Sequence, residues 1–290
     1  MSKLTELPKK LWQATPWGGP PKPTVTHLDL SGVIATSGRT GKNLNLRRLE
    51  KALDDAFKPS GLKAVAISVN SPGGSPVQSR LIHDRIRTLA AEKDVPVLTF
   101  VEDVGASGGY ILSIAGDEIY ADPSSVIGSI GVISGGFGFP EALSKLGVER
   151  RIYTAGSNKS QLDPFKPEDP QDIERLKVLL DELHAIFIGL VRERRHGKLS
   201  DNDEIFSGQF WAAGRAKELG LIDAIGEVRT VLKEKFGKDV KIKRIETDKK
   251  SLLQTIMSRG GMASPSLSLV DPDQLVDTLE EKSLWGRYGR

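Results

Sequence analysis

A serine lies in a run of small residues, Gly105-Ala106-Ser107-Gly108-Gly109, that fits the pattern G-x-S-x-G. On a sharp turn between a strand and a helix, this pattern exposes the serine hydroxyl and directs the neighbouring N–H groups toward one point. Ser107 is therefore a candidate nucleophile. A simple turn is the alternative interpretation, because the chain contains 30 glycines.

A second glycine pair follows another predicted strand, in the segment Asn70-Ser71-Pro72-Gly73-Gly74. Backbone N–H groups without side chains, placed between a strand and a helix, can form an anion-binding hole. Two such turns on adjacent parallel strands would face each other. Together they would supply a nucleophile and an oxyanion hole.

A serine nucleophile needs a base, and the usual partner is histidine. The chain has four histidines, and each falls inside a predicted strand or helix or just after one: His27, His83, His184 and His196. We interpret them as surface or packing residues. No two of them have the short spacing that metal ligands need, so no metal site is expected.

Lysine is the remaining candidate for the base. A lysine accepts a proton from serine only when it is neutral, which requires burial or cationic neighbours that lower its pKa. Lys159 lies in an irregular polar loop, residues 154–167, and the residues next to it are uncharged. A solvated loop lysine is the alternative interpretation. If Lys159 is the base, activity is expected to rise with pH through the alkaline range.

Short apolar runs alternate with segments of helical period, which is typical of βαβ units. The sequence therefore predicts an α/β fold with a mostly parallel sheet and functional loops at the carboxyl ends of the strands. The predicted strands cover residues 25–30, 63–69, 95–101, 118–120, 126–133, 148–153 and 240–245. The predicted helices cover residues 44–57, 77–93, 110–115, 140–146 and 170–194.

The longest predicted helix, residues 170–194, carries an apolar stripe with heptad-like spacing. It either lies on the sheet or makes a subunit contact. Residues 272–284 form a final amphipathic segment before the terminal WGRYGR.

Composition excludes several classes of protein. The chain has 290 residues, 38% of them hydrophobic, which is enough for a full core. It contains no cysteine, so disulfides, a thiolate nucleophile and Cys-based metal sites are excluded. With 41 basic and 38 acidic residues, it lacks the charge excess typical of a nucleic-acid binder. We expect no nucleic-acid partner and no cofactor.

The N-terminal region has no apolar run long enough for a signal peptide or a membrane span. We therefore expect a soluble, cytoplasmic protein. Residues 4–17, with Trp12 and Trp17 beside lysines, could touch the surface of the inner membrane. Packing of these tryptophans against the body or a neighbouring subunit is the alternative.

The segment ASGGYILSIAGDEIYADPSSVIGSIGVI resembles the signature of the signal peptide peptidase A and SohB group, peptidase family S49. The resemblance extends through VNSPGG and TAGSNKSQLDPF to SGQFWAAGRAKELGLIDAIG, and so covers most of residues 25–236. It implies a ClpP/crotonase-type fold of repeated ββα units and catalysis by a Ser–Lys dyad.

The resemblance also implies roles for individual residues. Ser107 matches the nucleophile, Lys159 the general base, and Ser129 the hydroxyl that orients the lysine. The family's oxyanion donors correspond to the N–H groups of Gly73 and Gly108, with Gly74 close by.

The chain departs from the family in lacking the usual N-terminal membrane anchor and in resembling the short, single-copy form. We expect an N-terminal extension (1–23), a peptidase domain (24–236) and a C-terminal extension with a tail helix (237–290). In the tandem long forms of the family, the serine and the lysine come from different halves. A single-copy chain is therefore expected to form a homo-oligomer, a ring, in which Lys159 of one protomer serves Ser107 of its neighbour. Residues 170–194 and the tail helix are the candidate contacts.

The function expected is a serine endopeptidase acting on peptides, such as signal-peptide remnants or unfolded segments. One alternative is an α/β-hydrolase-type esterase that uses His184 or His196. The other is a non-catalytic, crotonase-like acyl-CoA binder, which uses the same paired N–H groups.

Overall fold

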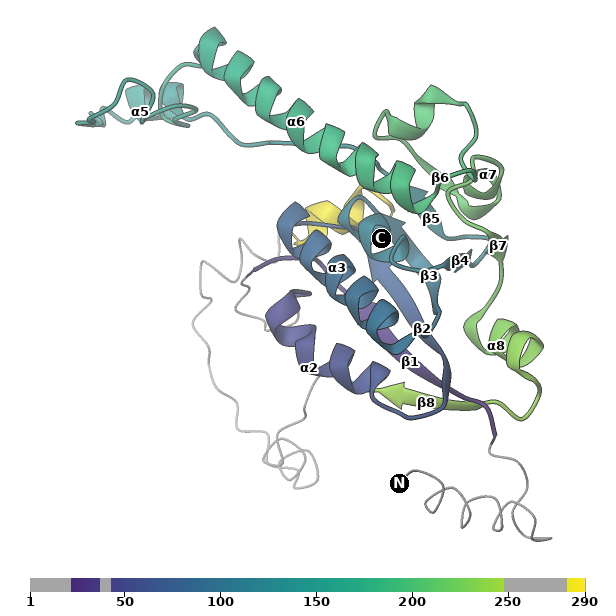
Figure 1. Cartoon of the computed structure of the whole chain (residues 1–290). Helices are drawn as coiled ribbons and strands as arrows, with labels where there is room; N and C mark the ends of the chain where they lie inside the picture. The colour runs from purple at the N-terminus through teal and green to yellow at the C-terminus, as the bar shows by residue number, and fades with distance from the viewer. Residues whose placement is uncertain (1–21, 37–42, 248–280, 290) are drawn as a thin grey trace, which may run out of the picture.

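The computed structural model describes residues 22–36, 43–247 and 281–289. Its centre is an eight-stranded sheet with the order β6-β5-β3-β2-β1-β8, in which β4 pairs with β3 and β7 (Figure 1). The strands are β1 (Thr24–Ser31), β2 (Leu62–Ser71), β3 (Val97–Ala106), β4 (Glu118–Ala121), β5 (Val126–Gly128), β6 (Phe210–Ala212), β7 (Ala224–Ile225) and β8 (Lys241–Ile245).

The sheet is parallel except for the antiparallel pair β5 and β6. β3 serves two neighbours in turn, because its first part pairs with β4 and its last three residues pair with β5. This arrangement confirms the predicted α/β class with a mostly parallel sheet. It also places the turns that follow β2, β3 and β5 at the same edge of the sheet.

Helices cover both faces of the sheet. α2 (Leu46–Phe57) and α3 (Pro76–Lys93) bury their apolar stripes against β1 and β2, and α8 (Val228–Phe236) covers the opposite face (Figure 1). α4 (Gly108–Ser113) and α7 (Ala213–Glu218) join a further apolar cluster over β4 and β5. The result is the layered core expected of an α/β fold.

The longest helix, α6 (Pro170–Arg194), leaves the body over most of its length (Figure 1). Its buried side chains, Phe187, Leu190 and Val191, all lie near its C-terminal end. The remainder projects outward together with α5 (Pro140–Lys145) and the connecting loops. We call residues 132–182 the arm. Of the two interpretations of this helix, packing on the body therefore applies only to its C-terminal third.

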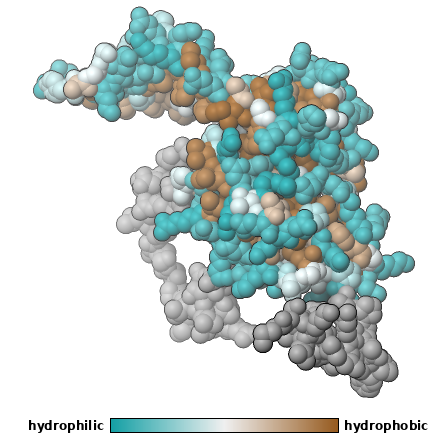
Figure 2. Space-filling view, viewed as in Figure 1, coloured by the Kyte–Doolittle hydropathy of each residue, from teal (hydrophilic) through white to brown (hydrophobic). Residues whose placement is uncertain are grey.

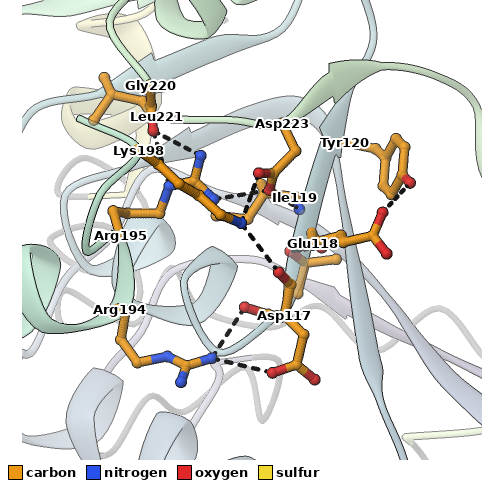
Figure 3. Close-up of polar contacts among 12 residues, drawn as sticks. Asp117, Glu118, Ile119, Tyr120, Arg194, Arg195, Lys198, Gly220, Leu221 and Asp223 are labelled. Atoms are coloured by element: carbon orange, nitrogen blue, oxygen red, sulfur yellow. Dashed lines mark hydrogen bonds and ion pairs between the residues drawn. The ribbon is translucent and has the colours of Figure 1, made fainter. Parts of the chain in front are cut away.

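Two arginines fasten the end of α6 to the body (Figure 3). Arg194 donates to the carbonyl oxygens of Ile114 (2.9 Å) and Gly116 (3.1 Å). Arg195, only 2% exposed, donates to Gly220 O (2.8 Å) and to Asp223 (2.8 Å).

Lys198 completes this network by donating to Asp223 at 2.8 Å. Burial alone would raise the pKa of Asp223, but the hydrogen bonds from Arg195 and Lys198 outweigh burial and hold that pKa below its ordinary value. Removing one partner from such a buried pair leaves an uncompensated charge, which is strongly destabilising. The network therefore fixes the direction in which the arm leaves the body.

Several predicted elements differ from the structure. The strand predicted at residues 148–153 is wrong: this exposed segment of the arm pairs with no strand among the described residues. The strand predicted at 126–133 ends at Gly128, because Gly128 (φ 117°) and Ser129 (φ 53°) leave the extended conformation. The predicted helix 170–194 is confirmed, and the strand predicted at 240–245 is confirmed with its start at Lys241.

Some expectations concern residues that the structure does not describe. Residues 4–17 lie outside the described ranges, and so does most of the predicted tail helix, although residues 281–286 are helical. The division at residues 23 and 236 stays a prediction, and β8 continues the sheet beyond residue 236 by pairing with β1. Within the described residues, we found no helix with the length and apolar character needed to cross a bilayer.

Candidate active site

Ser107 sits on a strained turn between β3 and α4. Its φ of 52° and ψ of −122° are unusual for a residue with a side chain. Its carbonyl oxygen accepts from Tyr110 N (2.9 Å) and so begins α4, whereas its side chain makes no cap hydrogen bond. The half-buried hydroxyl is therefore left for another partner. Strain of this kind at a turn is often a mark of function.

The two glycine turns meet at this serine, as the sequence predicts. A Cβ atom added to Gly73 (φ 100°) would lie 2.7 Å from Gly108 N and 2.9 Å from the Cβ of Ser107. A Cβ added to Gly108 would collide with the buried Ser79 hydroxyl and would lie 3.3 Å from Gly74 N. Only glycine permits the two backbones to approach this closely.

Backbone donors lie beside the serine hydroxyl. The N–H of Gly73 donates to Ser71 Oγ at 3.2 Å. Within the described part of the chain, the N–H groups of Gly74 and Gly108 donate to no acceptor. Gly108 is the first residue of α4, where backbone N–H groups are free by geometry. Gly74 and Gly108 are therefore the two donors that remain for an oxyanion.

Ser129 directly follows β5, the strand that pairs with the end of β3. Ala106 and Gly128 are paired residues of β3 and β5, and Ser107 N donates to Gly128 O at 2.8 Å. Ser129 N donates to Gln209 O at 2.6 Å, which holds the Ser129 backbone at its positive φ. Ser107 and Ser129 therefore each come directly after one member of the pair Ala106 and Gly128, so their backbones are neighbours at the end of these two strands.

Lys159 is not brought to Ser107 within one chain. It is exposed, and it belongs to the segment between α5 and α6, which is part of the arm that projects from the body (Figure 1). Its backbone N–H donates to Gly156 O at 3.2 Å. The site in a single chain therefore holds Ser107, Ser129 and the glycine turns, but not the lysine.

The histidines have other partners, which agrees with their interpretation as packing or surface residues. His184 Nε2 lies 3.0 Å from the carbonyl oxygen of Ile130, and His196 is exposed. His27 Nε2 lies 2.9 Å from Ser68 Oγ, and burial lowers the pKa of His27. His83 is buried on α3, where burial lowers its pKa although Asp84 opposes the shift.

An apolar groove of about 440 Å³ opens beside Ser107. Its walls come from the start of α3, from α4, from the segment after β5 and from α6. They include Val77, Ile111, Val132, Ile133, Ile186 and Phe187. Figure 2 shows apolar surface over this region, where the arm leaves the body. The groove can hold an apolar side chain next to the serine hydroxyl.

Sequence reasoning missed Tyr288. Its hydroxyl lies 3.2 Å from Ser129 Oγ, and its ring packs against Phe210 at 5.1 Å between centroids. The sequence signal was weak, because a tyrosine in a short terminal segment 159 residues from Ser129 has no spacing that links the two.

Comparison with known proteins now decides the family. Residues 90–243 match the model of peptidase family S49, and this match includes Ser107, Ser129 and Lys159. The chain belongs to peptidase family S49. Its α/β architecture with a mostly parallel sheet agrees with the fold class expected from the sequence.

Individual relatives of this S49 chain carry different names. A Brucella abortus protein described as Na(+)/H(+) antiporter NhaA is 52% identical over 265 residues, covering 90% of this chain and 36% of that protein. The chain thus spans about a third of that relative's length. Protease 4 of Haemophilus influenzae is 28% identical over 268 residues, covering 88% of this chain and 42% of that protein.

Solved structures include a mutant of the 1510-N membrane-bound stomatin-specific protease in complex with a substrate peptide. It shares 17% identity with this S49 chain, and the match covers 83% of this chain and 98% of the other, with a TM-score of 0.49.

Proposed function

We propose that this protein is a serine endopeptidase in which Ser107 is the nucleophile and Lys159 the general base. One observation in this S49 chain carries the proposal. Ser107, whose side chain makes no helix-cap hydrogen bond, lies on a strained turn beside the unpaired N–H groups of Gly74 and Gly108. A nucleophile next to preformed oxyanion donors is the arrangement that acyl transfer requires.

In the proposed reaction, Ser107 Oγ attacks the carbonyl carbon of a peptide bond while its proton passes to the neutral Lys159 Nζ. The negative charge on the carbonyl oxygen is stabilised by the free N–H groups of Gly74 and Gly108, and Gly73 packs beside them. Collapse of the tetrahedral intermediate breaks the C–N bond, and Lys159 returns the proton to the leaving amine. Water then hydrolyses the acyl ester by the same route in reverse.

We propose that the lysine comes from a second copy of this chain. The arm carries Lys159 away from its own Ser107 (Figure 1), and it exposes large apolar side chains: Phe137 is 82% exposed, Leu146 75% and Tyr153 90%. Burial of such side chains stabilises an interface by roughly 1.5–3 kcal/mol each. A homo-oligomeric ring would cover this surface and complete each site with a neighbour's lysine.

The substrates we propose are peptides or unfolded segments with an apolar residue near the scissile bond. An extended backbone can lie beside Gly131 to Ile133 while one of its side chains enters the apolar groove. Signal-peptide remnants have this composition.

Labelling with a fluorophosphonate tests the proposed mechanism against its two rivals. We expect the reagent to label Ser107 in the wild-type protein and in His184→Ala and His196→Ala, because neither histidine serves as the base. Labelling should be lost in Ser107→Ala and should fall sharply in Lys159→Ala. Mass spectrometry of the labelled peptide identifies the modified residue.

The rivals predict different patterns. An esterase triad would lose labelling in His184→Ala or His196→Ala and keep it in Lys159→Ala. A non-catalytic acyl-CoA binder would not be labelled in any form. The position of His184 Nε2 on the carbonyl oxygen of Ile130 speaks against the triad, because that nitrogen is already engaged.

Gly73→Ala should lower the specific activity at least about 100-fold, the size of an oxyanion-hole defect. The new Cβ would press on Gly108 N and displace one of the free donors. Gly61→Ala is the matched control, because Gly61 also has a positive φ (72°) but has no atom within 4 Å of the added Cβ. It should cost about 1 kcal/mol of stability and leave the activity per folded molecule unchanged. Equal activity of the two variants would contradict this role of Gly73.

A further inference from the structure

The C-terminal segment, residues 281–289, lies against the candidate active site. It is helical over residues 281–286 and ends in a turn in which Tyr288 N donates to Trp285 O at 3.0 Å. Leu284, Trp285 and Tyr288 are its half-buried residues, and Tyr288 contacts the body of the protein.

Tyr288 makes two specific contacts in this position. Its hydroxyl donates to Ser129 Oγ (3.2 Å), and its ring meets Phe210 edge-on with centroids 5.1 Å apart. Phe210 belongs to β6 and is paired with Gly128 of β5. Tyr288 and Ser129 are therefore held by the same pair of strands.

Ser129 is fixed from both sides by these contacts. Its backbone N–H donates to Gln209 O at 2.6 Å, and its side-chain oxygen accepts from Tyr288. A serine hydroxyl has one proton and two lone pairs. The tyrosine uses one lone pair, which leaves the other lone pair and the proton of Ser129 for an incoming lysine amine.

We infer that Tyr288 is a positioning residue: it fixes the rotamer of Ser129 so that Ser129 can hold Lys159 with its nitrogen lone pair toward Ser107. This inference rests on the proposed Ser–Lys mechanism. It makes the C-terminal segment part of the active site. A hydroxyl held by one further hydrogen bond spends less time in unproductive rotamers, so the effect belongs to the catalytic step rather than to substrate binding.

The test is a double-mutant cycle with full-length chains: wild type, Tyr288→Phe, Ser129→Ala and the double variant, assayed on an apolar peptide substrate. Tyr288→Phe keeps the ring on Phe210 and removes only the hydrogen bond. We expect kcat to fall about fivefold, the size of one neutral hydrogen bond, with KM unchanged. In the Ser129→Ala background, Tyr288→Phe should have no further effect, because its partner is gone.

Tyr120→Phe is the matched control, because Tyr120 donates to Glu118 away from the site, and its loss should leave kcat unchanged. Thermal unfolding shows whether each variant stays folded. The difference in tryptophan fluorescence between each variant and the same variant carrying Trp285→Phe isolates Trp285 from the other three tryptophans and shows whether the segment stays docked. A Tyr288→Phe enzyme with wild-type kcat, or with an equal loss in both backgrounds, would overturn the inference. A rise in kcat would overturn it too, because the segment would then obstruct the lysine. Failure of the proposed function shows separately, as a wild type without peptidase activity or an active Ser107→Ala variant.

Discussion

Replacing Ser107 with alanine should abolish peptide hydrolysis, with a loss of about 10⁴-fold or more, while the protein stays folded. The chain has no cysteine, so no thiolate can replace the serine as nucleophile. The Ser107 side chain makes no cap hydrogen bond, so its removal should change the free energy of unfolding by less than about 0.5 kcal/mol. Cleavage of a peptide substrate and a thermal melt of the same sample measure both quantities.

Ser124→Ala is the matched control for this substitution. Ser124 is an exposed serine in the turn after β4, and its backbone N–H, not its hydroxyl, is the group bonded to Asp122. This variant should retain full activity. More than a trace of activity in pure Ser107→Ala would end the assignment of Ser107 as nucleophile.

Mixing two inactive variants should restore activity if the site is shared between copies. Ser107→Ala chains keep the lysine and Lys159→Ala chains keep the serine. After subunit exchange at equal concentrations, about a quarter of the interfaces should pair an intact serine with an intact lysine. We therefore expect about a quarter of the wild-type rate from a mixture whose components are inactive alone.

Two controls separate this result from other causes. In a mixture of Lys159→Ala with the double variant Ser107→Ala/Lys159→Ala, neither chain has Lys159, so the mixture must stay inactive. Lys145→Ala removes a different exposed lysine of the arm and should retain activity. If the first mixture stays inactive although exchange is demonstrated by mass spectrometry, the dyad forms within one chain. Full activity of a monomer at high dilution would lead to the same conclusion.

Local pattern predicted the body of the fold well. Strands β1, β2 and β3 and helices α2 and α3 follow from apolar periodicity, because the strands and one face of each helix lie in the core. Helix α6 follows from the same periodicity, although only the C-terminal end of its apolar stripe is buried in this chain. Pattern failed in the arm, where residues 148–153 have the composition of a strand but pair with none in the described part of the chain. A strand needs a neighbouring strand to pair with its backbone N–H and C=O groups. The residue pattern of one segment does not show whether such a neighbour is present.

The sequence by itself determined the candidate nucleophile and the two glycine turns, because the turn chemistry is local and its residues are contiguous. Only the tertiary structure decided that the N–H of Gly73 donates to Ser71 Oγ. In the described part of the chain, the N–H groups of Gly74 and Gly108 are the ones left free for an oxyanion. It also decided that the segment between α5 and α6, to which Lys159 belongs, lies on the arm, and that the Tyr288 hydroxyl contacts Ser129 across 159 residues of chain. These contacts depend on how the arm and the C-terminal segment pack. Packing is set by surfaces distant in sequence, which no local spacing records.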